Sequence, residues 1–230
     1  MNTNILKRDY LTLKEIEKDI KYFANKYWKN AKKIVDIWCW KKPYKHYFWN
    51  NIYIWVDIID TWNQDIIANA WDTGLKDNEF DILVSNQSLE HIIETDKTIN
   101  EIKRIVKKWW HIFISLPFLY PQHWAPYDYY RFTYYWLLHK FKDFEIIEIK
   151  QTTYYFSTLI MLINQFFWAF PYSQYIFAPI FLVNNILWII LDNLFKFSFF
   201  VLWKKFQEIH DNFVKNYSSD YCIILKNRKK

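Results

Sequence analysis

The residues best suited to chemistry in this chain include two acids that lie in or after short apolar runs. Asp36 lies in the run 34–37, and Asp57 follows the run 52–56, 21 residues after Asp36. Carboxylates at the ends of strands can bind the hydroxyl groups of a nucleotide-like ligand. A single acid at a strand end is often only solvated, so the spacing of the two acids is the informative feature.

Proton-transfer and charged side chains are concentrated between positions 123 and 131. They are His123, Tyr127, Asp128, Tyr130 and Arg131. A histidine or aspartate there can act as a general base for an acceptor that carries a proton, and the other side chains can bind that acceptor. An Arg–Asp ion pair that holds a helix-entry loop explains the same residues equally well.

His91 is a further candidate base, because it ends a polar segment that follows the run 80–85. Taken alone, a histidine there more often satisfies local hydrogen bonds than performs catalysis. The 6 histidines and 2 cysteines show no spacing typical of metal ligands, so we expect no metal site. Cys39 and Cys222 predict no disulfide framework and fit a reducing compartment.

The elements that must position these residues alternate between strands and helices. Apolar runs predict strands at 34–37, 52–56, 65–68, 80–85, 112–116, 145–150 and 221–225. Helices are expected at 13–27 after a capping box at Thr12–Glu15, from a cap at Thr95 to an end at Trp109-Trp110, and from a cap at Thr133 to Phe141. This order predicts an α/β fold with a Rossmann-like, doubly wound and mostly parallel sheet of seven strands.

The segment from Gln151 to Leu191 differs in composition, because its 41 residues include no charged side chain. Pro171 divides it into the runs 154–170 and 175–191, each near the lower length limit for a membrane span, about 17 residues. We expect an apolar helical insertion before the last strand; a membrane hairpin, a hydrophobic lid and a dimer contact are the alternatives. The expected domains are a core at 1–150, the insertion at 151–216, and the last strand with a basic tail at 217–230.

Glycine is almost absent from the chain, and tryptophan is correspondingly frequent. The 1 glycine and 14 tryptophans together make 15 of 230 residues, close to an ordinary glycine share of about 7%. Turns with a positive φ need glycine. We hypothesise that the gene comes from a bacterium that reads UGA as glycine, and that UGA is written here as tryptophan. The alternative is a tryptophan-rich protein whose turns have almost no glycine.

With glycine at positions 38 and 40, Ile34–Tyr44 contains V-D-I-G-C-G, which resembles the first motif of class I methyltransferases that depend on S-adenosylmethionine (SAM). Ile54–Asp57 then resembles the family's second motif, G-V-D, and Asn69–Asp81 resembles the segment beside the adenine. The resemblance is to type 11-like methyltransferase domains and covers roughly residues 30–150. It implies SAM as the cofactor, bound by Asp36, Trp38, Cys39, Trp40, Asp57, Ala70, Asp72 and Gln87.

Later segments resemble the same family. Ser85–His91 is similar to the segment ending in L-E-H that faces SAM and the acceptor, and Val106–Phe118 to the L-K-P-G-G approach to strand five, with Lys108 in place of the usual proline. His123–Thr133, followed by Trp136-Leu137, is similar to the H-x-x-P-x-D-Y-x-R-F-T and G-L segment of one subgroup. The resemblance implies His91, His123 and Asp128 as catalytic candidates, and Tyr127, Tyr130 and Arg131 as substrate-binding residues.

The expected function is that of a SAM-dependent methyltransferase with a small-molecule or lipid-like acceptor near a membrane. The alternative is a non-catalytic membrane-associated protein with a Rossmann-like domain. An NAD-type oxidoreductase fits less well, because the restored glycines would read D-x-G-x-G rather than G-x-G-x-x-G. The net charge of +6 permits an anionic substrate or a membrane surface without selecting either. We expect no nucleic-acid partner and no signal peptide, and a cytoplasmic location at or in the inner face of the membrane.

Overall fold

The computed structural model describes residues 4–38, 43–49, 51–60, 64–170, 172–201 and 215–229. The chain forms two compact units. The first, called here the helical unit, comprises Met1–Glu17, Phe118–Pro121 and Gln151–Asp220. The second, the sheet unit, comprises Lys18–Pro117, Gln122–Lys150 and Tyr221–Lys230, and it contains every candidate site residue.

A seven-stranded sheet has the strand order β3-β2-β1-β4-β5-β7-β6. Its strands are β1 (Lys33–Ile37), β2 (Ile52–Asp57), β3 (Ile66–Ile67), β4 (Phe80–Asn86), β5 (Val106–Pro117), β6 (Glu145–Gln151) and β7 (Asp220–Lys226). The five strands from β3 to β5 in this order pair in parallel. β7 runs antiparallel to β5, because Trp109 bonds to Asn227 whereas Phe118 bonds to Ser219. The expected fold class is confirmed.

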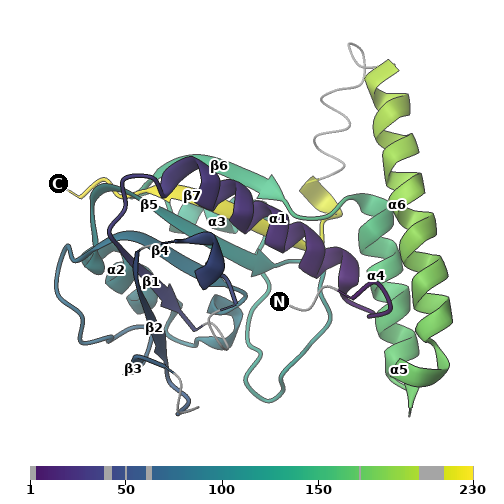
Figure 1. Cartoon of the computed structure of the whole chain (residues 1–230), viewed down its shortest axis with the longest axis horizontal. Helices are drawn as coiled ribbons and strands as arrows, with labels where there is room; N and C mark the ends of the chain where they lie inside the picture. Colours follow the sequence, from purple (N-terminus) through teal and green to yellow (C-terminus); the bar gives the residue numbers. More distant parts are fainter. Residues whose placement is uncertain are drawn as a thin grey trace. The chain divides into compact units, whose positions relative to one another are not determined.

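Helices cover the sheet on both faces (Figure 1). They are α1 (Tyr10–Tyr27), α2 (Thr95–Ile105) and α3 (Tyr134–Lys140), with short 3-10 turns η1 (Lys45–Tyr47) and η2 (Leu89–His91). α1 is amphipathic, and Phe23 on its apolar face packs against Phe113 of β5 with ring centroids 5.4 Å apart. α2 likewise buries Ile99, Ile102 and Ile105.

The register of the parallel strands brings their carboxyl ends to one edge of the sheet. Ile37 of β1 pairs with Val56 of β2, and Asp36 of β1 pairs with Val84 of β4. The central strands are apolar and buried on both faces, as parallel strands between two helix layers must be. The loops after β1, β2, β4 and β5 therefore meet at the edge where doubly wound sheets bind ligands.

The structure corrects three expected helix ends. α1 begins at Tyr10, so Thr12 lies inside the helix instead of capping it, and α2 begins at Thr95 with Glu94 as its N-cap. α2 ends at Ile105, and Trp109-Trp110 belongs to β5, because the backbone there pairs with Asn227 next to β7. The cap at Thr133 is confirmed, since its side chain accepts the N–H of Trp136 at 3.2 Å.

The helical unit contains α4 (Tyr155–Trp168), α5 (Ser173–Ile176) and α6 (Ala178–Val201). Amide side chains lie between α4 and α6: Asn164 accepts a hydrogen bond from Asn184 at 3.0 Å and donates one to Asn185 at 3.3 Å. Asn185 also donates to the carbonyls of Ile5 and Lys7, which places the start of the chain in this unit. Each helix found among the described residues is too short or too polar to cross a bilayer.

Asp81 at the start of β4 joins three segments of the sheet unit. Its Oδ2 accepts the N–H groups of Lys32 and Lys33 at 2.6 and 3.0 Å, and its Oδ1 accepts Lys107 Nζ at 2.6 Å. Burial alone would raise the pKa of Asp81, but the hydrogen bonds from the three lysine residues hold that pKa below its ordinary value. The resulting stabilisation is complete above the unfolded pKa, about 4, and is lost as the pH falls through the folded pKa.

Replacing Asp81 with asparagine is expected to lower the free energy of unfolding at pH 7 by about 1–3 kcal/mol, because a charged acceptor is lost. The variant should also lose less stability than the parent as the pH falls below about 4. Urea unfolding at both pH values measures the two effects. The control is Asp143→Asn, whose 69% exposed side chain pairs with Lys103 at 3.8 Å and should matter little. Equal effects at the two sites would contradict the prediction.

Candidate active site

Two acids lie at the carboxyl edge formed by β1 and β2. Asp36 is fully buried and accepts a hydrogen bond from the hydroxyl of Tyr53. Asp57, the last residue of β2, is 9% exposed, and its Oδ1 accepts the N–H of Ile59 at 3.1 Å. Burial raises the pKa of Asp57, although hydrogen bonds from the surrounding residues oppose the rise. Asp57 therefore lies at the end of β2 as a largely buried carboxyl group.

The turn after β1 begins in the left-handed conformation. Trp38 has a φ of 59°, and its N–H donates to the carbonyl of Val56 at 2.8 Å. This conformation costs a bulky residue about 1–2 kcal/mol, whereas glycine adopts it freely. The buried indole Nε1 of Trp38 has no hydrogen-bond partner within the described part of the chain. The backbone of this turn suits glycine; Cys39 and Trp40 lie outside the described residues.

The remaining cofactor candidates lie in the loops after β3 and β4. Ala70 is buried, and Asp72 is exposed and forms an isolated bridge with Asn69. Gln87 directly follows β4 with a φ of 50°, and its Nε2 donates to Ser115 Oγ at 3.3 Å. Gln87 is thus held against β5 at the ligand-binding edge, whereas the side chain of Asp72 faces solvent.

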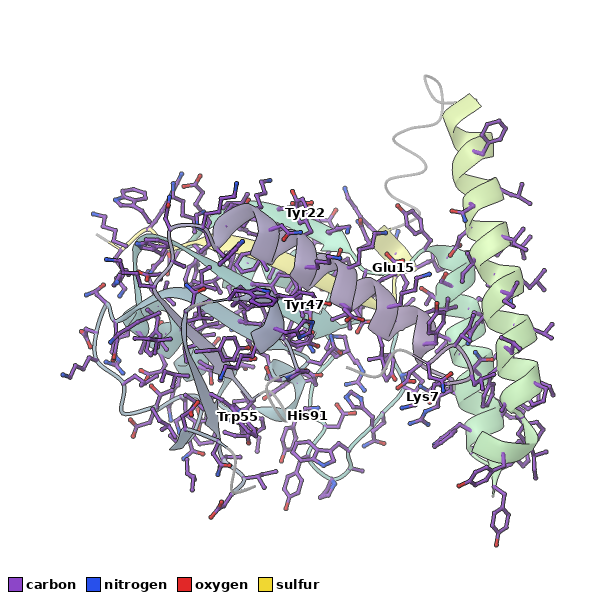
Figure 2. The ribbon with its side chains drawn as sticks, in the orientation of Figure 1. Lys7, Glu15, Tyr22, Tyr47, Trp55 and His91 are labelled. Carbon is purple, nitrogen blue, oxygen red and sulfur yellow. The ribbon has the colours of Figure 1, made fainter. Side chains whose placement is uncertain are left out.

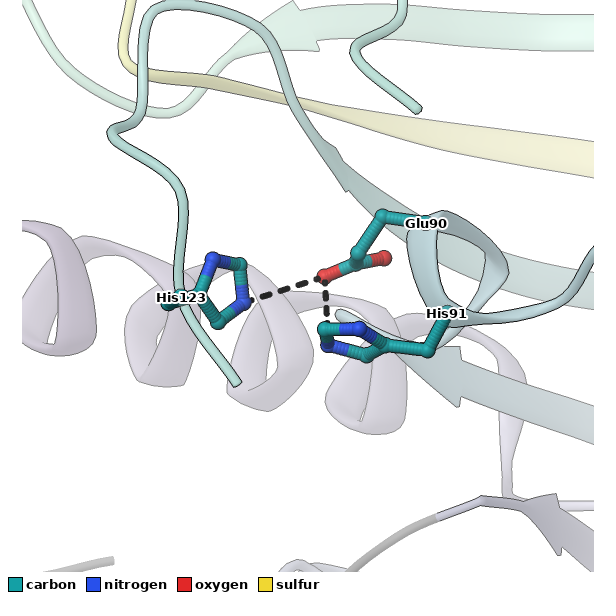
Figure 3. A group of neighbouring side chains, drawn as sticks. All are labelled: Glu90, His91 and His123. Carbon is teal, nitrogen blue, oxygen red and sulfur yellow. Dashed lines mark ion pairs between the residues drawn. The ribbon is translucent and has the colours of Figure 1, made fainter. Parts of the chain in front are cut away.

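Two histidines meet beside a buried carboxylate at the same edge (Figure 3). The rings of His91 and His123 are edge-to-face with centroids 4.9 Å apart. Their Nε2 atoms lie 3.7 and 3.8 Å from Oε1 of Glu90. Glu90 and His91 belong to η2, after β4, and His123 belongs to the loop after β5. The sheet topology therefore assembles this group from two separate loops.

Asp128 holds the loop that carries His123. Its carboxylate accepts hydrogen bonds from Arg131 at 2.6 and 2.8 Å and from the backbone N–H of His123 at 2.6 Å. Burial alone would raise the pKa of Asp128, whose side chain is 1% exposed, but these bonds keep that pKa below its usual range. The Arg–Asp pair of the helix-entry interpretation is present, and it orients His123.

Tyr127 and Tyr130 are exposed. Tyr127 contacts His91 through its backbone carbonyl, and Tyr130 contacts Ile93 through its hydroxyl group. The carbonyl of Tyr127 lies 2.5 Å from Nδ1 of His91, and the hydroxyl of Tyr130 donates to the carbonyl of Ile93 at 3.1 Å. Since a carbonyl only accepts, His91 carries its proton on Nδ1 and has a lone pair on Nε2. Burial lowers the pKa of His91, so this imidazole is neutral at pH 7.

The sequence interpretation missed Glu90 as a site residue. The signal was an acid next to a histidine in the segment ending in L-E-H, but burial of its carboxylate depends on tertiary packing. Spacing along the chain also failed to reveal that Glu90, His91 and His123 bring three metal-ligating atoms within 4.8 Å of one another. Tyr44 was missed as well; it is buried, and its hydroxyl accepts a hydrogen bond from Asn86 at 2.8 Å.

Comparison with known families identifies a domain in the middle of the chain. Residues 56–113, from the end of β2 into β5, match the family model described as a methyltransferase domain. The curated proteins include no sequence that matches this chain. The matched stretch contains Asp57, Gln87, Glu90 and His91, so it covers one acid of the sheet edge and half of the histidine pair.

Solved structures with this fold include SAM-dependent methyltransferases. One from Archaeoglobus fulgidus is 15% identical, with a TM-score of 0.54 and 92% of each chain covered. Phosphoethanolamine N-methyltransferase 2 of Haemonchus contortus, in complex with phosphomonomethylethanolamine and S-adenosylhomocysteine, is 12% identical, with a TM-score of 0.53, 92% of this chain and 53% of that chain covered. The [4+2]-cyclase SpnF is 12% identical, with a TM-score of 0.56, 93% of this chain and 81% of that chain covered.

These similarities agree on the fold of class I methyltransferases. The presence of a cyclase among the similar structures means that the fold alone does not decide the reaction. The family match is the finding that points to methyl transfer, and it supports SAM as the cofactor.

Replacing Trp38 with glycine is expected to give a protein about 1 kcal/mol more stable than replacing it with alanine. Both changes remove the indole, but only glycine relieves the left-handed backbone. The control is Trp136 in α3, where the order should reverse because glycine is the poorer helix former. Urea unfolding of the four variants measures both differences. An alanine variant at position 38 as stable as the glycine variant would contradict the prediction.

Proposed function

We propose that this chain is a SAM-dependent methyltransferase. The observation that carries the proposal is the match of residues 56–113 to a methyltransferase domain, because that stretch connects Asp57 at the end of β2 to η2 and β5. The matched region therefore overlaps the candidate site in part, through Asp57, Gln87 and His91, while Asp36 and the segment from His123 to Arg131 lie outside it. The shared fold of SAM-dependent methyltransferases supports the proposal.

The residues at the sheet edge fit SAM only in part. Asp57 has the position from which an acid takes ribose hydroxyls in related nucleotide sites, and the backbone at Trp38 has the φ of a glycine turn. The ligand must approach the backbone of this turn closely, however, and the bulky indole of Trp38 is attached to that backbone. The acids and the backbone suit the cofactor, and the side chain at position 38 does not.

The residues of the chain supply positioning and, for an acceptor that carries a proton, a base. SAM, when bound, supplies an activated methyl group. His91 is the best-placed base, because its Nδ1–H donates to the carbonyl of Tyr127 and its Nε2 can accept a proton. Arg131 and Asp128 hold the loop of His123 in place, and the exposed rings of Tyr127 and Tyr130 offer a surface for the acceptor. Alignment of two reactants can lower a barrier by about 7–11 kcal/mol at most.

The chemistry of the turn also supports the proposal that several tryptophans are misread glycines. Six non-glycine residues in the described part of the chain have a positive φ, and three of them are Trp38, Trp109 and Trp124. Asparagine tolerates this region, but a bulky residue does not. Trp55 gives no such support, because it is a fully buried residue of β2. UGA codons at positions 38 and 40 would support the proposal, and UGG codons there would overturn it.

The chain with glycine at positions 38 and 40 is expected to bind SAM at least about tenfold more tightly than the chain as written, because the turn then admits the ligand. Isothermal titration calorimetry measures both affinities. The control is Trp49→Gly, since that indole is 69% exposed and lies beyond the turn. Equal affinity in both chains would contradict the role of the turn. No binding to either chain would favour the non-catalytic alternative.

We further propose that the acceptor is lipid-like and is met at a membrane surface. Exposed apolar side chains recur along α6 at intervals of three and four residues, and side chains project outward along this helix in Figure 2. They are Val183, Ile186, Leu187, Ile190, Leu194 and Phe197. Exposed apolar side chains with this spacing are typical of an amphipathic helix that lies in the plane of a bilayer.

Cationic residues of the same unit add a site for anionic headgroups. Lys7 and Arg8 line a cavity of about 410 Å³ together with Asp9, Trp168 and Tyr175, so the lining carries two cationic side chains and one anionic side chain. The guanidinium of Arg8 lies 4.3 Å from the centroid of the Trp168 ring. Aromatic and basic side chains next to apolar helices are typical of proteins that bind at the lipid–water interface.

The double substitution Val183→Glu with Leu194→Glu is expected to weaken binding to vesicles of phosphatidylglycerol and phosphatidylcholine by roughly tenfold or more, since two apolar side chains leave the bilayer. Vesicle flotation measures the bound fraction. The control is Tyr135→Glu, a 78% exposed side chain on α3, which should bind as the parent does. If the parent chain does not bind vesicles, the proposed membrane binding is rejected. If the parent chain forms a dimer in light scattering, the apolar face of α6 is a protein contact instead.

A further inference from the structure

Two imidazoles and one carboxylate converge at the carboxyl edge of the sheet, and a methyl transfer needs at most one of them as a base. Glu90 is fully buried, and His91 is nearly so. The side chain of His123 is 30% exposed, which leaves the group accessible from solvent on one side. The buried carboxylate of Glu90 faces both imidazoles.

Two separations within this group are close to those of ligands around a cation, and the three ligand atoms all lie within 4.8 Å of one another. Nε2 of His91 and of His123 lie 3.7 and 3.8 Å from Oε1 of Glu90, as the dashed lines in Figure 3 mark. Hydrogen bonds span only about 2.7–3.2 Å, so neither contact is one. Two ligand atoms that each lie about 2.0–2.2 Å from a shared zinc ion are roughly 3–4 Å apart. A small inward movement of the side chains is enough to complete such a site.

The two histidines differ in the contacts of their other ring nitrogen. Nδ1 of His91 donates to the carbonyl of Tyr127 at 2.5 Å, which turns the lone pair of Nε2 toward Glu90. Nδ1 of His123 lies 3.4 Å from Oδ2 of Asp128 and 3.5 Å from the guanidinium of Arg131. Both contacts of His123 are long, but the carboxylate is the nearer group. Metal-bound histidines usually donate their second N–H to a carbonyl or a carboxylate. His91 has such an acceptor in the carbonyl of Tyr127, whereas the carboxylate of Asp128 lies beyond hydrogen-bond distance of His123 Nδ1.

We propose that Glu90, His91 and His123 bind a divalent first-row metal ion such as Zn²⁺, through one carboxylate oxygen and two Nε2 atoms. Two histidines and one glutamate form a ligand set of catalytic zinc sites, which keep a fourth position open. Water, or the oxygen of an acceptor, takes that position and becomes more acidic there. The role toward the acceptor rests on the proposed methyltransferase function, whereas metal binding does not.

The test is a titration of the full chain, freed of metal by dialysis against a chelator, with Co²⁺ alone and in the absence of SAM. Cobalt replaces zinc and reports its ligands through visible d–d absorption. We expect about one equivalent of Co²⁺ to bind and Zn²⁺ to displace it. His91→Gln and His123→Gln should each weaken binding at least about tenfold, and Asp128→Asn should weaken it about tenfold while it keeps the absorption bands.

The matched control is His139→Gln, because His139 is exposed on α3 and takes no part in the group. This variant should bind Co²⁺ as the parent does. Circular dichroism checks that each variant is folded, and Glu90→Gln provides a third ligand variant if a histidine variant unfolds. Absence of saturable binding, or equal affinity in the parent and the ligand variants, would overturn the proposal. Because SAM is not present, a failed methyltransferase function leaves this result unchanged.

Discussion

The register of the parallel strands is the constraint on which the candidate site depends. β1 pairs with both β2 and β4, and β4 pairs with β5, so the residues that follow these strands reach one edge. The carboxylate of Asp81 ties the beginnings of β1, β4 and β5 together at the opposite end. A slip of one residue would turn each strand over and move its buried side chains to the wrong face. The position of the acids and histidines is thus a consequence of sheet packing.

Electrostatics then decide what the assembled residues can do. Arg131 occupies both oxygens of Asp128, which keeps this carboxylate ionised and attached to the loop of His123. His91 is buried and neutral, and the carbonyl of Tyr127 selects its tautomer. A neutral imidazole with a defined lone pair serves equally well as a base or as a metal ligand. The lone pair on Nε2 serves only one of these roles at a time, so a bound metal would take the place of His91 as the group that activates the acceptor.

In the helical unit, polar side chains lie between two helices and apolar side chains are exposed, which is the reverse of the usual arrangement. Amides of Asn164, Asn184 and Asn185 pair with one another between α4 and α6, while the outer face of α6 is apolar. In water, helices normally bury their apolar face and expose their polar one. An apolar environment around the exposed face of α6, such as the proposed lipid surface, would remove this conflict. The amides that interrupt the apolar run in the sequence are therefore a means of joining two helices.

The order of strands and helices follows from local sequence patterns, because buried parallel strands require continuous apolar runs and helices require a repeating apolar face. Asp36, Asp57, His91 and the segment from His123 to Arg131 could be predicted as candidate site residues from the sequence, since their types and spacing are local properties. The end of α2 was misjudged, because pairing of β5 with the chain next to β7 overrides the local signal at Trp109-Trp110. The burial of Glu90 beside two histidines from different loops could not be predicted in this way. Burial and distance depend on contacts between segments far apart in sequence, which no local pattern encodes.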